Sequence, residues 1–303
     1  MKFHKKILAI ICASALATTG FQLFSGNQIK AAVFSTPSVT DLTETTSTIW
    51  VPKNFDSLIK NLISNLLSSK HSYLNSKVDS QIKKAANQQE GHNKFIASPA
   101  DLKTLVNTTH MTSSQQKQVT EYVVNLINSI RKTTGTHKVY ATSGAITFAN
   151  QIANGYNKDK WDFAKQNNTH DCFVINSVAK KDHLAYVINV WGAPGTGLQD
   201  YEDISEGYLP QQKTISMAAL KQGIYNTIID MMFNDGGTLK NGKFDPGEAW
   251  GHALDLTGYS LTQQLPEYVG LSIDQMGQIH IEMIVASDIL PSTNLPNLTQ
   301  PLK

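Results

Sequence analysis

Two short stretches near the end of the chain decide the fold: YVGLSI at residues 268–273 and QIHIEMI at residues 278–284. Both are rich in branched and aromatic residues and alternate in character, which is typical of β-strands. The intervening DQMG has the turn chemistry of a hairpin. We therefore predict an antiparallel hairpin. Because side chains alternate along a strand, Ile279, Ile281 and Met283 are expected to face the core, and His280 and Glu282 the solvent.

Upstream of the hairpin, the stretch WGHAL at residues 250–254 places His252 directly after a glycine. Glycine lets the backbone pass close to its neighbours, and the hairpin supplies a rigid wall, so His252 is expected to face a cavity. His170 is a second candidate for the same cavity. The plainer alternative is that both histidines are hydrogen-bonded structural residues that brace the sheet.

Helical patterns precede the hairpin. Thr112 and Gln115 form a capping box that predicts a helix running to Gly135. Further helices are expected at residues 143–156 and at 216–232, with a long, polar, solvent-facing loop at 192–212 between them. Helices first and a hairpin last predict an α+β fold in which helices pack against an antiparallel sheet.

The N-terminal third reads differently from the rest. Lysines followed by a short apolar run predict a secretory signal peptide, since the run is too short for a membrane-spanning helix. Apolar residues spaced by three and four predict a helix from Asn54 to Leu67, which packs on the main domain or on a partner. The predicted organisation is a signal peptide at 1–32, a flexible leader at 33–50, a helical region and linker at 51–111, a main domain at 112–285 and a disordered tail at 286–303.

Composition limits the function classes. The chain has 303 residues, 41% of them hydrophobic, and a formal net charge of +2, which suits a globular protein. Arg131 is the sole arginine, and sequence-specific nucleic-acid readers rely on bidentate arginine, so we expect no nucleic-acid partner. Once the signal peptide is removed, Cys172 is the only cysteine, so no internal disulfide is expected.

In their order and spacing these features resemble the CAP superfamily, and more closely the PgrA-type surface exclusion proteins of Gram-positive bacteria. The resemblance rests on NLINSIR (125–131) before Gly135, on His170-Asp171, on MFND (232–235), on the glycine–histidine segment and on the final hairpin. It covers roughly residues 112–285, and the helical region from Asn54 onward is also similar to the PgrA-type proteins. It implies a three-layer α-β-α sandwich with a central cavity and an N-terminal helical extension.

The resemblance also implies a site. The family's cavity is often lined by two histidines and two acids that can hold a divalent metal, and here His170, His252 and Asp235 match three of them. The second acid is expected in an aromatic-Glu-Asn segment, where this chain has Ile188 followed by Asn189. Two imidazoles and one carboxylate can still form a three-ligand zinc site with an open position for water. Asp235 has a rival role as a turn-forming residue before two glycines.

Three classes of function follow from the resemblance. The favoured one is a secreted or non-covalently surface-associated protein that binds a cell-surface or cell-wall component or another protein, without catalysis. The second is a metal-dependent hydrolase acting on peptide or wall material, with Glu202, Asp203 or Glu206 of the long loop as conceivable acids. The third is a carrier of lipid or another small apolar ligand.

Overall fold

The computed structural model describes residues 44–68, 74–166, 170–187, 198–210, 212–240, 242–245, 249–260 and 265–303, so the predicted signal peptide lies outside them. At the centre is a four-stranded sheet in the order β2-β7-β8-β3. β2 and β7 run parallel, whereas β7–β8 and β8–β3 are antiparallel. The sheet strands are β2 (Val139–Ala141), β3 (Glu202–Ser205), β7 (Glu267–Ile273) and β8 (Ile279–Val285).

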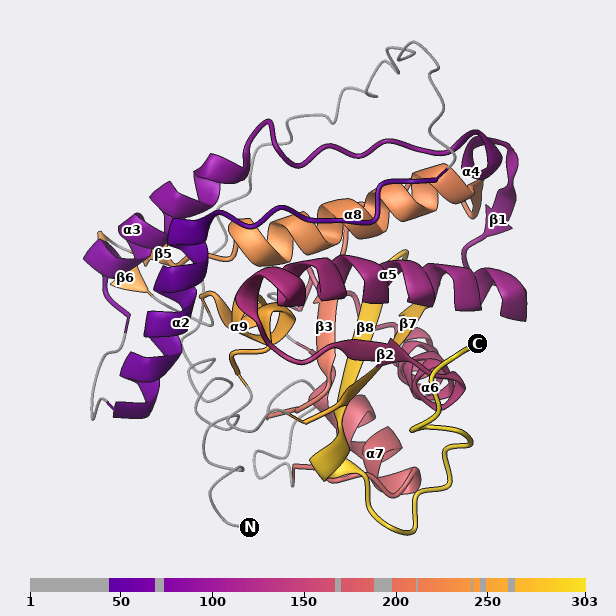
Figure 1. The fold of residues 1–303 in the computed structure, drawn as a ribbon. Coiled ribbons are helices and arrows are strands. Elements are labelled where there is room, and N and C mark those ends of the chain that lie inside the picture. The colour runs from indigo at the N-terminus through magenta and orange to yellow at the C-terminus, as the bar shows by residue number, and fades with distance from the viewer. Residues whose placement is uncertain are drawn as a thin grey trace.

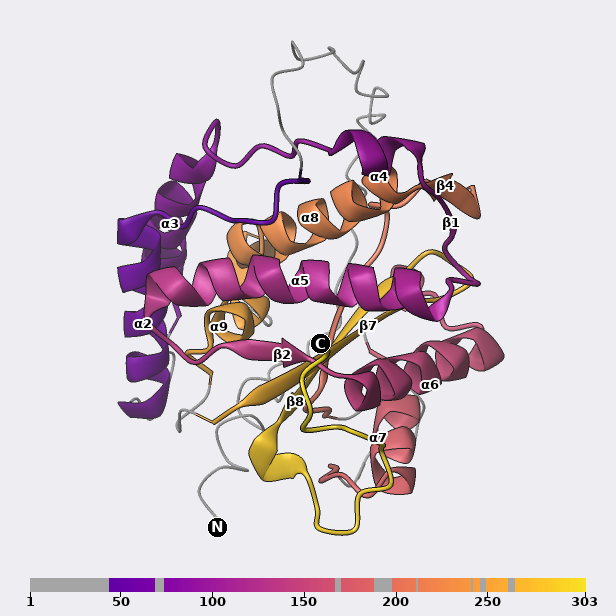
Figure 2. The ribbon, with the colours of Figure 1, turned by 45° about the vertical axis from the view of Figure 1, so that its right-hand side comes forward.

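Helices cover both faces of this sheet, which gives an α+β fold with the three layers that the resemblance implies (Figures 1 and 2). The side chains of Val269, Leu271 and Ile281 join one hydrophobic cluster, whereas those of Tyr268 and Ile284 join another. Because side chains alternate along each strand, they contribute to two separate hydrophobic cores, one on each face of the sheet. The covering helices are α5 (Ser113–Thr134), α8 (Met217–Phe233) and α9 (Gly251–Thr257) on the first face, and α6 (Ser143–Asp159) and α7 (Cys172–Lys181) on the second.

The predicted hairpin is confirmed, but the exposure of its polar residues was predicted wrongly. Residues 267–273 pair with 279–285, and Gly277 takes a left-handed φ of 84° at the turn. His280 and Glu282 are buried completely rather than solvated. The reason is that β8 is an inner strand with β3 on its far side, and α6 and α7 cover the face to which these two side chains point.

The predicted helix ends are confirmed where local chemistry sets them. Thr112 and Gln115 exchange hydrogen bonds at the start of α5, and Gly135 ends it with a φ of 71°. Near this end Arg131 is buried, where it forms an ion pair with Glu267 of β7 and donates to the carbonyl oxygen of Asp255 at 2.9 Å. The only arginine of the chain is therefore a structural link between α5, α9 and the sheet.

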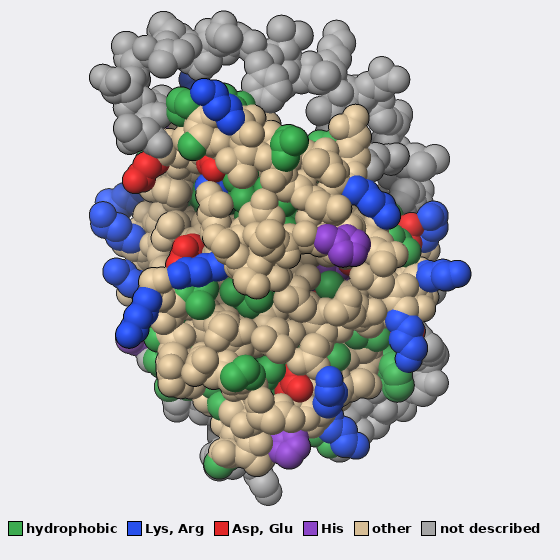
Figure 3. Space-filling view, turned by 90° about the vertical axis from the view of Figure 1, so that its right-hand side faces the viewer, with side chains coloured by type: hydrophobic (Ala, Val, Ile, Leu, Met, Phe, Trp, Pro, Cys, Tyr) green, Lys and Arg blue, Asp and Glu red, His purple; other side chains and the backbone are tan. Residues whose placement is uncertain are grey.

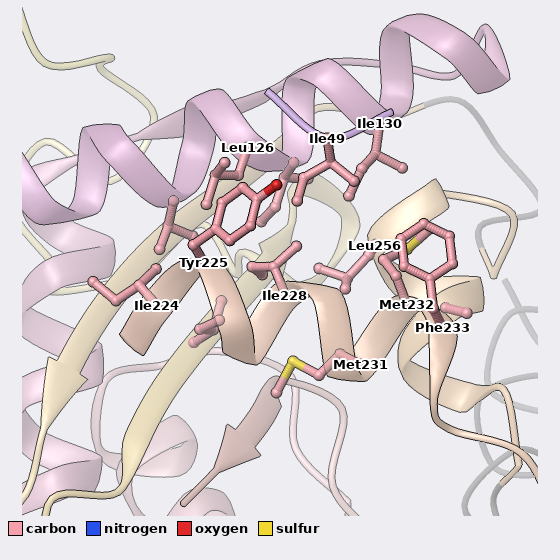
Figure 4. Close-up of a cluster of buried hydrophobic side chains, with 14 of the residues drawn as sticks. Ile49, Leu126, Ile130, Ile224, Tyr225, Ile228, Met231, Met232, Phe233 and Leu256 are labelled. Carbon is pink, nitrogen blue, oxygen red and sulfur yellow. The ribbon is translucent and has the colours of Figure 1, made fainter. Parts of the chain in front are cut away.

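The helical N-terminal region packs on the main domain. Phe55, Ile59 and Leu62 are buried in the same cluster as α8 and α9, and Ile49 of the preceding segment joins α5 and α8 in the close-up of Figure 4. Order begins earlier than predicted, because Ile49 and Thr45 within the expected flexible leader are already buried. The region comprises α2 (Lys53–Ser68), α3 (Ser76–Ala86), a 3₁₀ turn (Asn87–Gln89) and α4 (Pro99–Lys103).

The final segment was predicted to be disordered, and this prediction is wrong. Leu295 and Leu298 are buried in the cluster beneath α6, and the amide of Leu302 donates to the carbonyl oxygen of Ala141 on edge strand β2 at 2.9 Å. Spaced leucines anchor a segment without regular structure, so no periodicity marks it in the sequence. A 3₁₀ turn (Ala286–Asp288) begins it, and the remaining short strands are β1 (Leu105–Asn107) with β4 (Thr214–Ser216), and β5 (Thr238–Lys240) with β6 (Lys243–Asp245).

Among the helices that the structure describes, we find none that combines the length and the apolar character needed to cross a membrane.

Candidate functional site

A sealed cluster of acids and histidines lies between the sheet and the α6–α7 layer. Its centre is Glu202 of β3, which the strand register sets opposite Glu282 of β8. One oxygen of Glu202 lies 2.6 Å from Nδ1 of His280, and the other lies 2.8 Å from Nδ1 of His170 and accepts a hydrogen bond from the hydroxyl of Tyr156. Glu202, His280 and Glu282 are fully buried as side chains. We call these five residues the sealed cluster.

The electrostatics of the sealed cluster follow from these contacts. Burial alone would raise the pKa of Glu202, but hydrogen bonds from His170 and His280 together with their charges hold it well below its usual range. Burial would lower the pKa of His280, yet hydrogen bonds and charges of Asp274 and Glu202 raise it to about 9. Glu202 is therefore a carboxylate paired with a protonated imidazole.

Glu282 behaves in the opposite way. Burial, and next the charge of Glu202, raise its pKa well above the ordinary value. Neither of its oxygens has a hydrogen-bond partner among the described residues. Two carboxyl groups this close cannot both ionise easily, so Glu282 is the one that keeps its proton.

Close packing of α6 seals this cluster. The ring of Tyr156 stands edge-on to the imidazole of His280, with 4.6 Å between centroids. Gly270 of β7 allows the approach, because a β-carbon there would lie 2.0 Å from the carbonyl oxygen of Ala145 on α6. A side chain at position 270 would push the helix off the sheet.

A second group of polar residues, which we call the open pair, lies on the opposite face of β3. It consists of His252 at the start of α9 and Asp235 just after α8, with 3.3 Å between Nδ1 and Oδ2. The backbone amide of His252 also donates to Oδ2 of Asp235 at 3.2 Å. Both side chains are about a quarter exposed, at 25% and 22%. The open pair therefore reaches solvent, whereas most of the sealed cluster does not.

Asp203 lies behind the open pair. Its Oδ1 is 3.9 Å from Nε2 of His252, and its Oδ2 is buried without a hydrogen-bond partner in the described part of the chain. Burial raises the pKa of Asp203 well above the ordinary value. The charge of His252 lowers the pKa, whereas the charges of Asp255, Asp235 and Glu202 raise it. The side chain is therefore held in its neutral form over a wide pH range.

The structure brings only some of the sequence-predicted site residues together. His252 and Asp235 are in contact, whereas His170, with a side chain 14% exposed, contacts Glu202 of the sealed cluster. Ile188 and Asn189 lie outside the described residues. A zinc ion held jointly by His170, His252 and Asp235 stays a prediction.

Sequence reasoning gave too little weight to Glu202. It assigned this residue to a solvent-facing loop, but residues 202–205 form a buried strand paired with β8. A signal was present, because Tyr201-Glu202-Asp203 is an aromatic-Glu-acid segment close to the aromatic-Glu-Asn pattern that the resemblance called for. Glu206 accepts a hydrogen bond from the amide of Ala164 at 3.2 Å and so fastens a turn.

One group in the described residues is compact enough to hold a metal ion. Glu202, His280 and Glu282 each offer a ligand atom, and these atoms lie within 4.8 Å of one another. The oxygens of Glu282 have no hydrogen-bond partner among the described residues, but both oxygens of Glu202 already accept hydrogen bonds. A metal at this position would have to displace a donor from Glu202.

Comparisons with known proteins support the fold. No family model matches the chain, and no curated protein matches its sequence. Among solved structures, the CAP domain of Enterococcal PrgA matches with a TM-score of 0.58 and 19% sequence identity, over 82% of this chain and 90% of that chain. The chain therefore has the CAP fold that its sequence resembles. Residues 112–303 make up less than two thirds of the chain, whereas the match covers 82% of it. The match therefore extends into the N-terminal helical region.

Proposed function

We propose that this chain is a surface exclusion type of protein, exported and held at the cell surface, that uses its CAP fold to bind a cell-surface or cell-wall component or another protein. In this proposal the sealed cluster braces the sheet, and the open pair is the polar feature that meets the partner. The observation that carries the proposal is the engagement of Glu202 within the protein. Three donors already bind a carboxylate whose side chain is closed to solvent, so a substrate does not reach it without displacing part of the fold.

The surface of the molecule is compatible with binding a neutral or mixed partner. On the face shown in Figure 3, basic side chains are dispersed and hydrophobic side chains emerge in small, separate patches. A nucleic-acid interface would be expected to gather basic residues into a continuous patch or stripe. This supports a partner of the protein or wall type.

Binding to whole cells tests the proposal directly. The labelled full chain is titrated onto intact Gram-positive cells and onto purified wall sacculi, and we expect saturable binding to at least one of them. His252→Gln combined with Asp235→Asn should weaken that binding about tenfold, since partly exposed polar groups at the centre of an interface commonly contribute about 1–2 kcal/mol.

The matched control is His183→Gln. His183 is an exposed histidine on the opposite layer, where Nδ1 lies 2.9 Å from the hydroxyl of Ser292, and its replacement should leave cell binding unchanged. Absence of saturable binding to cells and sacculi alike would rule the proposal out.

A metal-dependent hydrolase is the second candidate, and one observation favours it. Glu282 has two buried oxygens without a hydrogen-bond partner in the described part of the chain, and with His280 and Glu202 it offers a compact set of ligand atoms for a metal ion. A zinc ion held there would polarise a carbonyl group or lower the pKa of a bound water. In that case His170 and Tyr156 would orient Glu202 through their hydrogen bonds.

Metal analysis separates the two candidates. Purified protein is loaded with zinc, freed of excess by gel filtration and analysed for bound metal. The binding protein should carry far less than one zinc per chain. One zinc per chain that is lost in both Glu282→Gln and His170→Ala would favour the hydrolase.

A further inference from the structure

The N-terminal helices reach the open pair through one buried carboxylate. Asp79 of α3 is 3% exposed, and its Oδ1 accepts hydrogen bonds from the backbone amide of Gly237 at 2.9 Å and from the indole Nε1 of Trp250 at 3.0 Å. Gly237 follows Asp235 by two residues, and Trp250 precedes His252 by two. A single oxygen therefore ties together the two chain segments that carry the open pair.

Lys83, one turn further along α3, reinforces this contact. Its Nζ lies 2.8 Å from Oδ2 of Asp79 and also donates to the carbonyl oxygen of Gly237. The approach is close, since a β-carbon at Gly236 would lie 2.2 Å from Cε of Lys83. The loop after α8 is thus clamped against α3 by both its amide and its carbonyl group.

Trp250 connects Asp79 to the segment that carries His252. It is fully buried, packs edge-on against Phe55 of α2 with 5.8 Å between centroids, and holds a left-handed φ of 67°. A bulky residue in that conformation persists only where its surroundings hold it. The amide of Trp250 donates to the carbonyl oxygen of Asp235 at 2.7 Å, so the strained residue also fixes the acid.

We propose that Asp79 is the positioning residue of the open pair, so that the N-terminal helices, although remote in sequence, set the distance and orientation between Asp235 and His252. The inference concerns the site on which the proposed function rests. It is tested on the pair itself, without any partner, so its failure and the failure of cell binding are separate results.

Hydrogen exchange of the full chain, followed by mass spectrometry, tests this proposal. In Asp79→Ala, peptides containing Gly237 and peptides containing Trp250 to His252 should exchange at least tenfold faster than in the parent. Asp79→Asn keeps an oxygen in place to accept from Gly237 and Trp250, and should restore slow exchange. A second readout is the rate at which diethyl pyrocarbonate modifies His252. This rate should rise severalfold in Asp79→Ala and return to the parent value in Asp79→Asn.

Asp101 supplies the matched control. Like Asp79, it is a buried aspartate of the N-terminal region that pairs with a lysine, and 2.8 Å separate it from Nζ of Lys221. Unlike Asp79, it connects α4 to α8 and to Thr45, away from the open pair. Asp101→Ala should lower the melting temperature while leaving exchange and labelling at His252 unchanged. Equal acceleration in both alanine variants would overturn the proposal, as would unchanged exchange in a folded Asp79→Ala.

If Asp79→Ala does not fold, Trp250→Phe replaces it. This change removes the indole N–H donor and keeps most of the buried ring. Exchange at His252 should then rise about threefold, and unchanged exchange would refute the positioning role.

Discussion

Glu202 and Asp203 are adjacent on β3 and both are buried, yet their carboxyl groups respond to burial in opposite ways. Glu202 points to the α6–α7 layer, where Tyr156 and two histidines donate to it, and its pKa falls. Asp203 points to the other layer, where Oδ2 finds no donor among the described residues, and its pKa rises. Burial decides little by itself, because the donors that each face supplies determine which carboxyl group is charged.

The largest effect is expected from Glu202→Gln. The amide cannot replace a carboxylate that accepts from three donors, and it leaves the buried imidazolium of His280 with Asp274 alone, 3.4 Å from its Nε2, as counter-charge. The free energy of unfolding at pH 7 should fall by roughly 3–5 kcal/mol, measured by urea denaturation.

Glu282→Gln on the same face is the control for this prediction. Because Glu282 is held neutral, its amide analogue should cost no more than about 1 kcal/mol. Equal losses in the two variants would show that the sealed cluster does not distinguish its two acids.

The next largest effect is a pH dependence from His280. Its pKa in the folded state is about 9 against an ordinary 6.5, so its stabilising contribution is complete below pH 6.5 and is lost as pH rises through 9. One pKa unit corresponds to roughly 1.4 kcal/mol, so the parent should exceed His280→Gln by about 3 kcal/mol more at pH 6 than at pH 9.5. Denaturation of both proteins at each pH measures this, and a pH-independent difference would contradict it.

A smaller effect of opposite sign is expected from Asp203→Asn. Since the folded state raises the pKa of Asp203, keeping it neutral destabilises the fold progressively as pH rises above the ordinary value of 3.8. Its neutral analogue should therefore stabilise the protein at pH 7 by on the order of 1 kcal/mol, and by nothing at pH 3. Thermal unfolding at the two pH values checks this, and a loss like that of Glu202→Gln would remove the contrast between the two faces.

The smallest effect is expected from His252→Gln. The open pair is partly hydrated, and exposed ion pairs contribute about 0–1 kcal/mol to stability. The melting temperature should change by only a few degrees at most. A loss comparable to that of Glu202→Gln would mean that the open pair is as structural as the sealed cluster.

Local chemistry explains what the sequence predicted well. Helix α5 begins and ends where Thr112, Gln115 and Gly135 place its caps, and the hairpin turns at Gly277, because caps and turns are interactions among near neighbours. The order of such elements predicted helices packed against a sheet, and the resemblance implied the three layers. Of the candidate site, the contact between His252 and Asp235 unites two residues that the resemblance had already singled out.

Long-range partners explain what the sequence predicted poorly. Glu202 in a Gly- and Asp-rich stretch looks like a loop residue until His170 and His280, 32 and 78 positions away in sequence, are brought to it. Leu295 and Leu298 look like part of a loose tail until α6 offers a surface for them.

The sequence by itself determined where α5 and the β7–β8 hairpin begin and end, because backbone caps, turns and side-chain periodicity act over a few residues. Only the tertiary structure decided that β8 is an inner strand, that its histidine is buried and charged, and that Asp79 of α3 reaches the segments around Asp235 and His252. Those outcomes depend on which distant donor or acceptor meets each polar group when water is excluded, and a one-dimensional pattern does not carry that information.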